Sequence, residues 1–340
     1  MSEVDSFRSI GDVAMGIVRE LSLGDVEIHK VDPVRDREGW LKLRQKDVTA
    51  SDVASIAGVG YRSPREVWAD KTGQIGQKAD TPVLRRGRRF EPSLWATIKE
   101  ENPSWEIRAG KVYLRAPSLR FGATPDAMAI DPERPGLILI QGKVVAKPVF
   151  VADWLGGDRE GTNPIVPLGY QLQTLAETML ASIAFKQVIH PYVAAWVIDT
   201  FSEDLKMIPL VRHPVAEQKI LETVKGFWDL LDAGGVPAID PTRDHDLVRK
   251  LYPVDDGSII DLSSDNLLPD LFDERKKLGE VISSSEKRRD EISTEIMAKI
   301  GAATFALIAG GRKLSLKVTN VKEQQRAAYS FRSLREVKVK

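Results

Sequence analysis

Two short segments of the 340-residue chain carry the side chains whose types and spacing suggest chemistry most strongly. The residues at 124–126 are Thr-Pro-Asp, within one β-like run, and those at 141–143 are Gln-Gly-Lys, within the next. Side chains two residues apart in a strand face the same side. Two acids at positions equivalent to 126 and 141 can together hold Mg²⁺, and a lysine at the position of 143 can orient a water or stabilise a phosphorane. The pattern indicates metal-assisted phosphodiester hydrolysis, and a plain turn between strands is the alternative for 124–126.

Composition limits the other kinds of chemistry that this chain can do. It contains no Cys, which excludes a disulfide framework, thiol catalysis and Cys-based zinc or iron–sulfur sites. The four His residues are scattered, so a His-rich zinc site is not indicated. Lys plus Arg and Asp plus Glu each number 49, which argues against a uniformly basic nucleic-acid binder. Because it has no apolar run of about 18 residues and no signal-peptide pattern, we expect a cytoplasmic globular protein without membrane contact.

The elements that must position these segments predict an α/β (α+β) fold, with a mixed central sheet flanked by helices. Ser51 is the expected N-cap of a helix that ends at Gly58, and Ser63-Pro64 begins another. Apolar residues at helical spacing predict three further helices, and β-branched runs predict strands, of which the first three form a small meander. The helices are expected at 87–102, 167–184 and 215–235, and the strands at 105–116, 119–131, 136–145, 186–199 and 204–213.

Shifts in composition divide the chain into an N-terminal extension, a domain with the motifs, and a charged helical C-terminal region, at 1–35, 36–253 and 254–340. The C-terminal region begins with an acidic stretch at 255–274 and continues with a charged helix at 269–299. Its tail, 312–340, holds nine Lys or Arg and two Glu, a local net charge of +7. That tail is a candidate DNA contact, and pairing with the acidic stretch of its own or a neighbouring subunit is the alternative.

The two chemical segments belong to a set of five motifs in a fixed order. These are REGWLKLRQKDVTASDVASIAGVG, RRGRRFEP, LRFGATPDAM, IQGK and YQLQTLAETML, followed by FWDLLDAGGVPAID. In these motifs the chain resembles the YqaJ/lambda-type exonuclease family of the PD-(D/E)XK nuclease superfamily, from about Arg37 to Tyr252. Five ordered motifs are far more specific than any single one of them.

The resemblance implies a restriction-endonuclease-like PD-(D/E)XK core and an exonuclease that uses Mg²⁺ or Mn²⁺, with two ions per site. It further implies degradation of the 5′ strand from double-stranded DNA ends, which leaves 3′ single-stranded overhangs for recombination. Family members can form trimeric rings, so the expected partners are DNA ends, further copies of this chain and a single-strand annealing protein.

The resemblance also assigns roles at the metal site. Asp126 corresponds to the bridging metal ligand, Gln141 to the position of the second acid, and Lys143 to the catalytic lysine. The backbone carbonyl of Gly142 is a further candidate ligand, and Glu91 is expected to contact a second ion through water. The family thus implies a two-ion site built from two strands and one helix.

A second group of residues matches the parts of the family that bind DNA. Gln173 is expected to point at the scissile phosphate or the attacking water, and a surface amide is the alternative. Arg44, Ser51 and Thr124 match the pocket for a 5′-terminal phosphate, which a bidentate guanidinium suits. Leu84 matches an apolar wedge at the terminal base pair, with a buried core leucine as the alternative. Backbone phosphate contact, or a solvated face, is expected for the basic cluster Arg85, Arg86, Arg88 and Arg89.

Gln141 departs from the family, which has Glu at this position. An amide keeps the shape of the side chain but lacks the charge that a Mg²⁺ ligand supplies. A substitution that traps a complex, a natural inactive branch and a misread strand register are the three explanations. No acid lies between Gly136 and Lys147, so a shifted register supplies no replacement. We therefore expect a weakened or inactive nuclease, and the alternative function is a non-catalytic DNA-end-binding recombination scaffold. A nickase or endonuclease fits less well, because an internal phosphodiester has no terminal phosphate.

Overall fold

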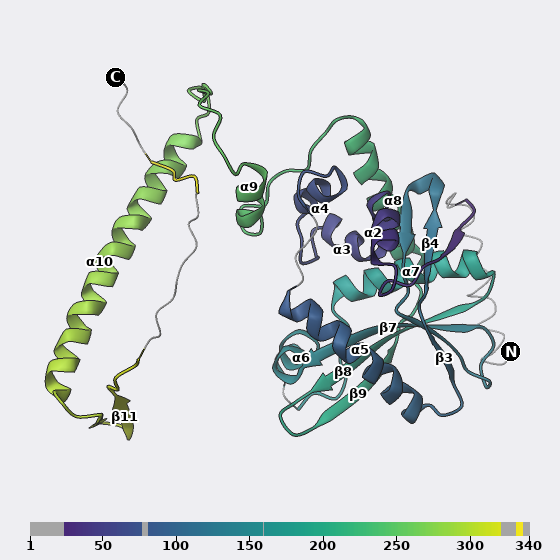
Figure 1. Cartoon of the computed structure of the whole chain (residues 1–340), viewed down its shortest axis with the longest axis horizontal. Helices are drawn as coiled ribbons and strands as arrows, with labels where there is room; N and C mark the ends of the chain where they lie inside the picture. The colour runs from purple at the N-terminus through teal and green to yellow at the C-terminus, as the bar shows by residue number, and fades with distance from the viewer. Residues whose placement is uncertain (1–23, 77–80, 159, 321–330, 336–340) are drawn as a thin grey trace. The chain divides into compact units, whose positions relative to one another are not determined.

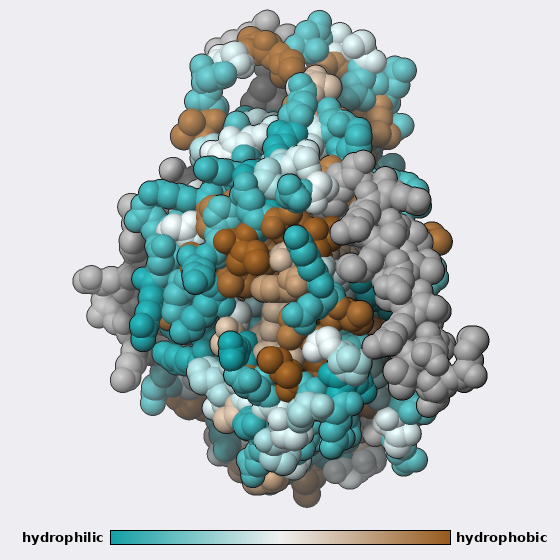
Figure 2. Space-filling model, turned by 90° about the vertical axis from the view of Figure 1, so that its right-hand side faces the viewer, coloured by the Kyte–Doolittle hydropathy of each residue, from teal (hydrophilic) through white to brown (hydrophobic). Residues whose placement is uncertain are grey.

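The computed structural model divides into two compact units, which are Met1–Leu251 and Tyr252–Lys340 (Figure 1). It describes residues 24–76, 81–158, 160–320 and 331–335. Within these ranges no helix is long and apolar enough to cross a membrane. Hydrophilic residues cover most of the face in Figure 2, and hydrophobic ones form smaller groups near its centre. All five sequence motifs lie in the first unit.

The larger sheet of the first unit has five strands in the order β3-β6-β7-β8-β9. Their bounds are Glu106–Ala109 for β3, Ala127–Ile130 for β6, Leu137–Ala146 for β7, Ile189–Ile198 for β8 and Glu203–Pro209 for β9. Strands β7 and β8 run parallel and every other pair is antiparallel, so the predicted mixed α/β sheet is confirmed. Ala127 pairs with Ile140, and this register sets Asp126 opposite Gln141.

A second sheet corrects the prediction of a single meander. It has four strands in the order β1-β4-β5-β2, with the bounds Glu27–Lys30, Val112–Ala116, Phe121–Ala123 and Val48–Thr49. The chain from 105 to 146 therefore passes from the larger sheet to the smaller one and back. Strand β1 lies in the predicted N-terminal extension, where it pairs with β4. The β-like runs fixed where strands form but not which neighbour each would pair with, because pairing depends on distant residues.

Helices cover both faces of the larger sheet. Helix α5 (Pro82–Glu101) packs Leu94 and Ile98 against β7, in one hydrophobic cluster. The opposite face is covered by α6 (Lys147–Asp153) and α7 (Leu168–Phe185). On the α5 side, a Cβ at Gly142 would lie 2.7 Å from Leu94 Cδ2. Glycine at the centre of the motif therefore allows α5 to approach the strand, while residue 141 faces α7.

The remaining helices of the first unit surround the smaller sheet. They are α2 (Arg37–Gln45), α3 (Ala50–Ile56), α4 (Pro64–Lys71), α8 (Pro214–Asp232) and α9 (His245–Leu251). Helix α4 begins as predicted, with Ser63 accepting from the backbone N–H of Glu66. The predicted cap at Ser51 is wrong, because Thr49 forms a reciprocal capping box with Asp52 and α3 already begins at Ala50.

The start of α5 and the buried face of α7 differ from the sequence prediction. Helix α5 begins at Pro82 rather than Gly87, because Thr81 caps it and a proline suits the first turn. In α7, Leu175 and Met179 are buried as the predicted apolar stripe requires. Leu168, at the start of that stripe, is exposed. The stripe therefore meets the core only from the second turn onward.

The second unit consists of one long helix and a hairpin. Helix α10 spans Leu268–Ile300, and β10 (Phe305–Ile308) pairs antiparallel with β11 (Arg312–Ser315). In the part of the chain that the structure describes, no residue of α10 is buried. The predicted charged helix therefore forms, with i,i+4 and i,i+3 ion pairs on its surface. Much of the predicted basic tail, at 321–330 and 336–340, lies outside the described residues.

Candidate active site

The two chemical segments of the sequence meet at one point of the larger sheet. Asp126 precedes β6, is half-buried, and lies beside Gln141 in the middle of β7. The carboxylate Oδ2 of Asp126 accepts from the side-chain amide of Gln141. It also accepts from the backbone N–H of Gly142 at 3.0 Å. The structure thus brings together Asp126, Gln141 and Gly142, as the strand register requires.

Helix α7 supplies a glutamine to the same cluster. The Nε2 of Gln173 donates to Oε1 of Gln141 over 2.8 Å, so Gln173 points into the site rather than to solvent. Lys143 shares the strand face of Gln141, and its ammonium lies 4.7 Å from the centroid of the Tyr170 ring. The charge of Lys143 also lowers the pKa of the Asp126 carboxyl, against the larger effect of burial, which raises it. Lys143 is therefore within electrostatic reach of the acid.

Glu177 is a member of this cluster that the sequence did not reveal. It lies one turn after Gln173, whose Nε2 also donates to Oε1 of Glu177 at 2.9 Å. Glu177 is 1% exposed, and its Oε2 has no hydrogen-bond partner among the described residues. Burial, and next the negative charge of Asp126, raise the pKa of Glu177 to about 8. The one available signal was an acid at i+4 from Gln173 within the apolar run LAETML.

Glu91 approaches the site from α5, on the other side of the sheet. It is half-buried, and burial followed by the charge of Asp126 raises its pKa. Within the described ranges, no three His, Cys, Asp or Glu side chains form a group arranged to hold a metal ion. Glu91 is thus within electrostatic reach of Asp126 without forming a compact acid cluster with it.

The donor set was tested against the divalent cation that the motifs imply. The side chains at the site are a carboxylate and two amides, whose oxygens are the hard ligands that Mg²⁺ takes, and the carbonyl of Gly142 remains the predicted further ligand. Two acids with raised pKa values flank them, and one has a buried oxygen without a partner. A cation would favour the ionised form of both acids. The residues therefore fit a Mg²⁺ or Mn²⁺ site, with one carboxylate fewer on β7 than the motif requires.

Glu177 gives the fold a measurable dependence on pH. Its pKa rises from 4.5 to about 8 on folding, so between these values the folded chain holds the proton more tightly than the unfolded chain. The free energy of unfolding should therefore fall as pH rises from 4.5 to 8. Glu177→Gln should remove this contribution, which amounts to about 1.4 kcal/mol per pKa unit. Urea unfolding with EDTA at several pH values measures it, and parallel curves for both proteins would contradict it.

The residues of the predicted phosphate pocket also come together. The Arg44 guanidinium donates to the hydroxyls of Thr49 at 3.2 Å and Ser51 at 3.1 Å. The same guanidinium lies over the Trp40 ring, 4.5 Å from its centroid. The indole Nε1 of Trp40 donates to the hydroxyl of Thr124 at 2.9 Å. Trp40 thus connects Arg44 to Thr124, and neither Trp40 nor Thr49 was predicted as part of the pocket.

A buried acid, Asp52, contacts the residues of the predicted pocket. Asp52 accepts from the backbone N–H of Thr49 at 3.0 Å and is ion-paired with Lys71 at 3.1 Å and with Arg62. Burial alone would raise the pKa of Asp52, but Lys71, Arg62 and Arg44 outweigh it and hold the pKa well below the usual range. Among the described residues Asp52 forms its ion pairs with Arg62 and Lys71, whereas the Arg44 guanidinium donates to hydroxyl groups.

The predicted wedge and basic cluster occupy the first half of α5. Leu84 is 43% exposed, so the alternative of a buried core leucine is excluded. The guanidinium of Arg86 lies over the Phe90 ring, 5.5 Å from its centroid. The other three arginines of the cluster are exposed, and Glu91 follows them on the same helix. An apolar side chain and a basic surface thus lie on the helix that carries Glu91.

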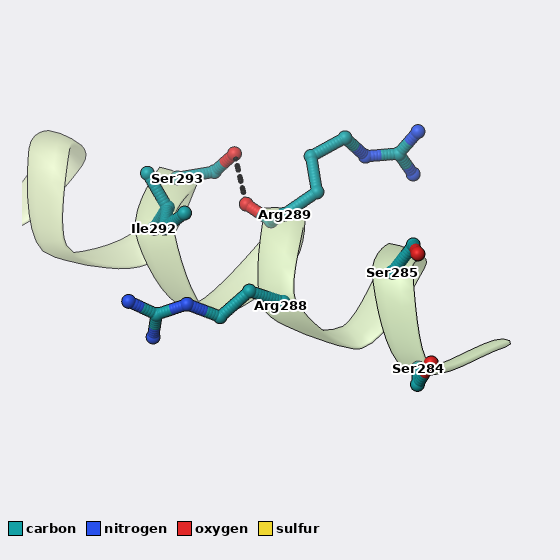
Figure 3. Close-up of a pocket in the computed structure, with 6 residues that line it drawn as sticks. All are labelled: Ser284, Ser285, Arg288, Arg289, Ile292 and Ser293. Carbon is teal, nitrogen blue, oxygen red and sulfur yellow. Dashed lines mark hydrogen bonds between the residues drawn. The ribbon is translucent and has the colours of Figure 1, made fainter. Parts of the chain in front are cut away.

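The hollows on α10 are not part of this site. The one in Figure 3 is lined by residues of a single helix, with the Arg288 and Arg289 side chains pointing to different sides. Ser293 donates its hydroxyl to the backbone carbonyl of Arg289 at 2.8 Å, an ordinary bond within a helix. A second hollow is likewise lined by α10 residues alone. These are grooves between exposed side chains and contain none of the motif residues.

Comparison with solved structures gives weak matches. The alkaline exonuclease LHK-Exo of Laribacter hongkongensis matches with 18% identity over 58% of this chain and 93% of that one, with a TM-score of 0.41. LHK-Exo in complex with dAMP matches over the same shares at the same identity, with a TM-score of 0.42. A protein of Eubacterium rectale matches with 14% identity over 66% of this chain and 95% of that one, with a TM-score of 0.38. No curated protein sequence matches.

A family model matches part of the chain. The model of the YqaJ-like viral recombinase domain matches residues 39–182. This range includes the strand pair, the Gln173–Glu177 turn and the residues of the predicted phosphate pocket. This match confirms the resemblance found in the sequence motifs: residues 39–182 of this chain are similar to the YqaJ-like viral recombinase domain.

Proposed function

We propose that this protein is a divalent-cation-dependent exonuclease that degrades the 5′ strand from double-stranded DNA ends. The observation that carries the proposal is the proximity of two sites with different chemistry. Asp126 and Gln141 meet at one, and Arg44 and Ser51 form the other. Arg44 acts electrostatically on Asp126, so both sites lie within reach of one DNA end. A pocket for a terminal phosphate beside a hydrolytic site gives an enzyme its polarity.

The chemistry of each residue follows from its position. Asp126, the Gln141 amide and the Gly142 carbonyl would hold Mg²⁺ or Mn²⁺, with Glu91 toward a second ion. When bound, the cation supplies positive charge at the scissile phosphate and lowers the pKa of water. Lys143 stabilises negative charge on the phosphate, and Gln173 orients the phosphate or the water through its amide. The arginines of α5 contact the DNA backbone, where they add affinity without sequence preference.

The amide at position 141 leads us to propose a weakened enzyme. Gln141 is buried and already hydrogen-bonded to both Asp126 and Gln173, so it stabilises the site without bringing charge. A non-catalytic DNA-end-binding scaffold is the second candidate function, which this same observation favours. On the ground of the family resemblance alone, we further propose that the chain assembles into a ring with other copies of itself. The same ground suggests that it works with a single-strand annealing protein and is located in the cytoplasm.

The proposed function is tested with linear and closed circular DNA. The full chain and its Gln141→Glu variant are incubated with Mg²⁺, 5′-phosphorylated linear duplex or relaxed circular duplex of the same sequence. We expect the linear duplex to lose nucleotides from its 5′ strand while the circle stays intact, with EDTA abolishing the loss. Cleavage of the circle would favour an endonuclease. Binding to linear ends without any cleavage by either protein would favour the scaffold.

Arg44→Ala should remove the preference for a phosphorylated end. A charge-assisted contact with the terminal phosphate is worth about 1.5–3 kcal/mol, or roughly ten- to a hundredfold in rate. In the Gln141→Glu background, initial rates on 5′-phosphate and 5′-hydroxyl duplexes measure that preference. Arg37→Ala is the matched control, because Arg37 also lies near the Trp40 ring, 5.9 Å from its centroid. If Arg44→Ala slows both substrates equally, the pocket does not read the terminal phosphate.

A further inference from the structure

The buried carboxyl of Glu177 has no role in the fold that the described residues explain. It is 1% exposed, and within the described part of the chain its carboxyl accepts a hydrogen bond from the amide of Gln173 alone. Its second oxygen has no partner among the described residues, although buried polar atoms are generally paired. The other buried glutamate, Glu217, has both oxygens on the Arg212 guanidinium, at 2.6 and 2.8 Å. Glu177 therefore differs from an acid kept for a structural ion pair.

The position of Glu177 relates it to the acid that β7 lacks. Gln173 donates one amide group to both Gln141 and Glu177, at 2.8 and 2.9 Å. Gln141 in turn donates to Asp126. A continuous chain of polar groups therefore leads from the carboxyl on α7 to the carboxyl beside β6. The chain passes through residue 141, where the motif requires a negative charge.

We propose that Glu177 supplies, from α7, the negative charge that position 141 lacks, and that it acts on a cation at Asp126 through Gln173 and Gln141. This inference rests on the proposed function, because it assumes that Asp126 and Gln141 form the cation site. Glu177 is a positioning residue in this account, since it touches neither the cation nor DNA.

Two physical effects let a carboxylate act at this distance. First, it attracts a divalent cation through a water-poor interior, where charges interact more strongly than in water. Lys143 and Arg44 act electrostatically on Glu177 as well, but neither forms an ion pair with it among the described residues, so a cation at Asp126 would favour its ionised form. Second, an ionised carboxylate only accepts hydrogen bonds, so it holds the amide N–H of Gln173 toward Glu177. The orientation of the Gln141 amide then follows from its two partners.

The experiment measures cation binding without DNA. Free Mn²⁺ is titrated with the full chain and followed by its electron paramagnetic resonance signal, for the natural chain, Glu177→Gln, Gln141→Glu and the double variant. Glu177→Gln keeps the acceptor for Gln173 and removes only the charge. We expect it to weaken Mn²⁺ binding about tenfold or more in the natural background. In the Gln141→Glu background the same change should cost less than about threefold, because a direct acid ligand replaces the indirect one.

The double variant restores the motif with the same number of acids, and we expect it to bind Mn²⁺ at least as tightly as the natural chain. Glu217→Gln is the control, since it removes a buried acid outside the site. It should lower thermal stability, because Arg212 loses its partner, and leave Mn²⁺ affinity unchanged. Glu177→Gln should instead weaken Mn²⁺ binding without lowering thermal stability. Equal Mn²⁺ affinity for the natural chain and Glu177→Gln would overturn the inference, as would an equal loss in both backgrounds.

Failure of the inference is distinguishable from failure of the proposed function. If the natural chain and Gln141→Glu digest linear DNA but Glu177→Gln binds Mn²⁺ as the natural chain does, the exonuclease stands and the role of Glu177 falls. If none of the four proteins digests DNA while Glu177→Gln still weakens Mn²⁺ binding in the natural background alone, the role of Glu177 stands and the exonuclease falls.

Discussion

Gln141→Glu should raise the rate of Mg²⁺-dependent digestion of a 5′-phosphorylated duplex at least about a hundredfold, since an anionic ligand supplies several kcal/mol of metal-assisted stabilisation. The change adds no bulk, because the amide and the carboxylate have the same shape. Gln141 is 1% exposed and contacts Asp126 and Gln173, so the new carboxylate would face the other acid of the site. Without a cation, two such acids repel each other, and with a cation they share it.

That reasoning gives a second readout for the same variant. In EDTA, Gln141→Glu should unfold at a lower temperature than the natural chain, and in Mg²⁺ this difference should shrink or reverse. Gln218→Glu is the matched control, because it makes the same substitution on the exposed surface of α8. Digestion rates are compared at saturating Mg²⁺ and at several lower concentrations. Equal rates for Gln141→Glu and the natural chain would show that residue 141 is not part of the cation site.

Local features of the fold were predictable from the sequence because short-range chemistry determines them. Ser63 followed by Pro64 fixes the start of α4, since a hydroxyl caps the first turn and proline suits it. The two-residue period of an extended strand decides which side chains of β7, at residues 137–146, share a face. The meeting of Asp126 with Gln141 then follows from the antiparallel pairing of β6 with β7.

Other features depend on residues far apart in the sequence. Strands β4 and β5 leave the larger sheet and pair with β1 and β2, which no local pattern encodes. Trp40 joins the residues of the predicted phosphate pocket because its indole donates to Thr124, 84 residues away. Glu177 lies in an apolar helical run, where an acid commonly marks the solvent-facing side. The packing of α7 on the sheet, which no local pattern encodes, is what buries Glu177.

Asp126→Ala, introduced into the Gln141→Glu variant, should abolish cleavage while leaving binding to duplex ends intact. Asp126 is the residue on which the site converges, because its Oδ2 accepts from both Gln141 and the Gly142 N–H, and it is the acid that the motif assigns to the metal. Loss of this carboxylate removes a ligand that no neighbouring acid can replace from the same strand. Arg44 and Ser51 hold each other independently of Asp126, so the end-binding pocket should persist.

Asp126→Asn separates the charge of this residue from its structural contacts. The asparagine carbonyl can still accept from the Gly142 N–H at 3.0 Å, whereas alanine leaves that group without its acceptor. If Asp126 acts as a ligand, both variants should lose cleavage, and Asp126→Asn should stay as stable as its parent in EDTA. Filter binding of 5′-phosphorylated duplex in Ca²⁺ measures end binding beside the digestion assay. Loss of end binding in both variants would make Asp126 a residue that holds β6 to β7, and the cation site would then have to lie elsewhere.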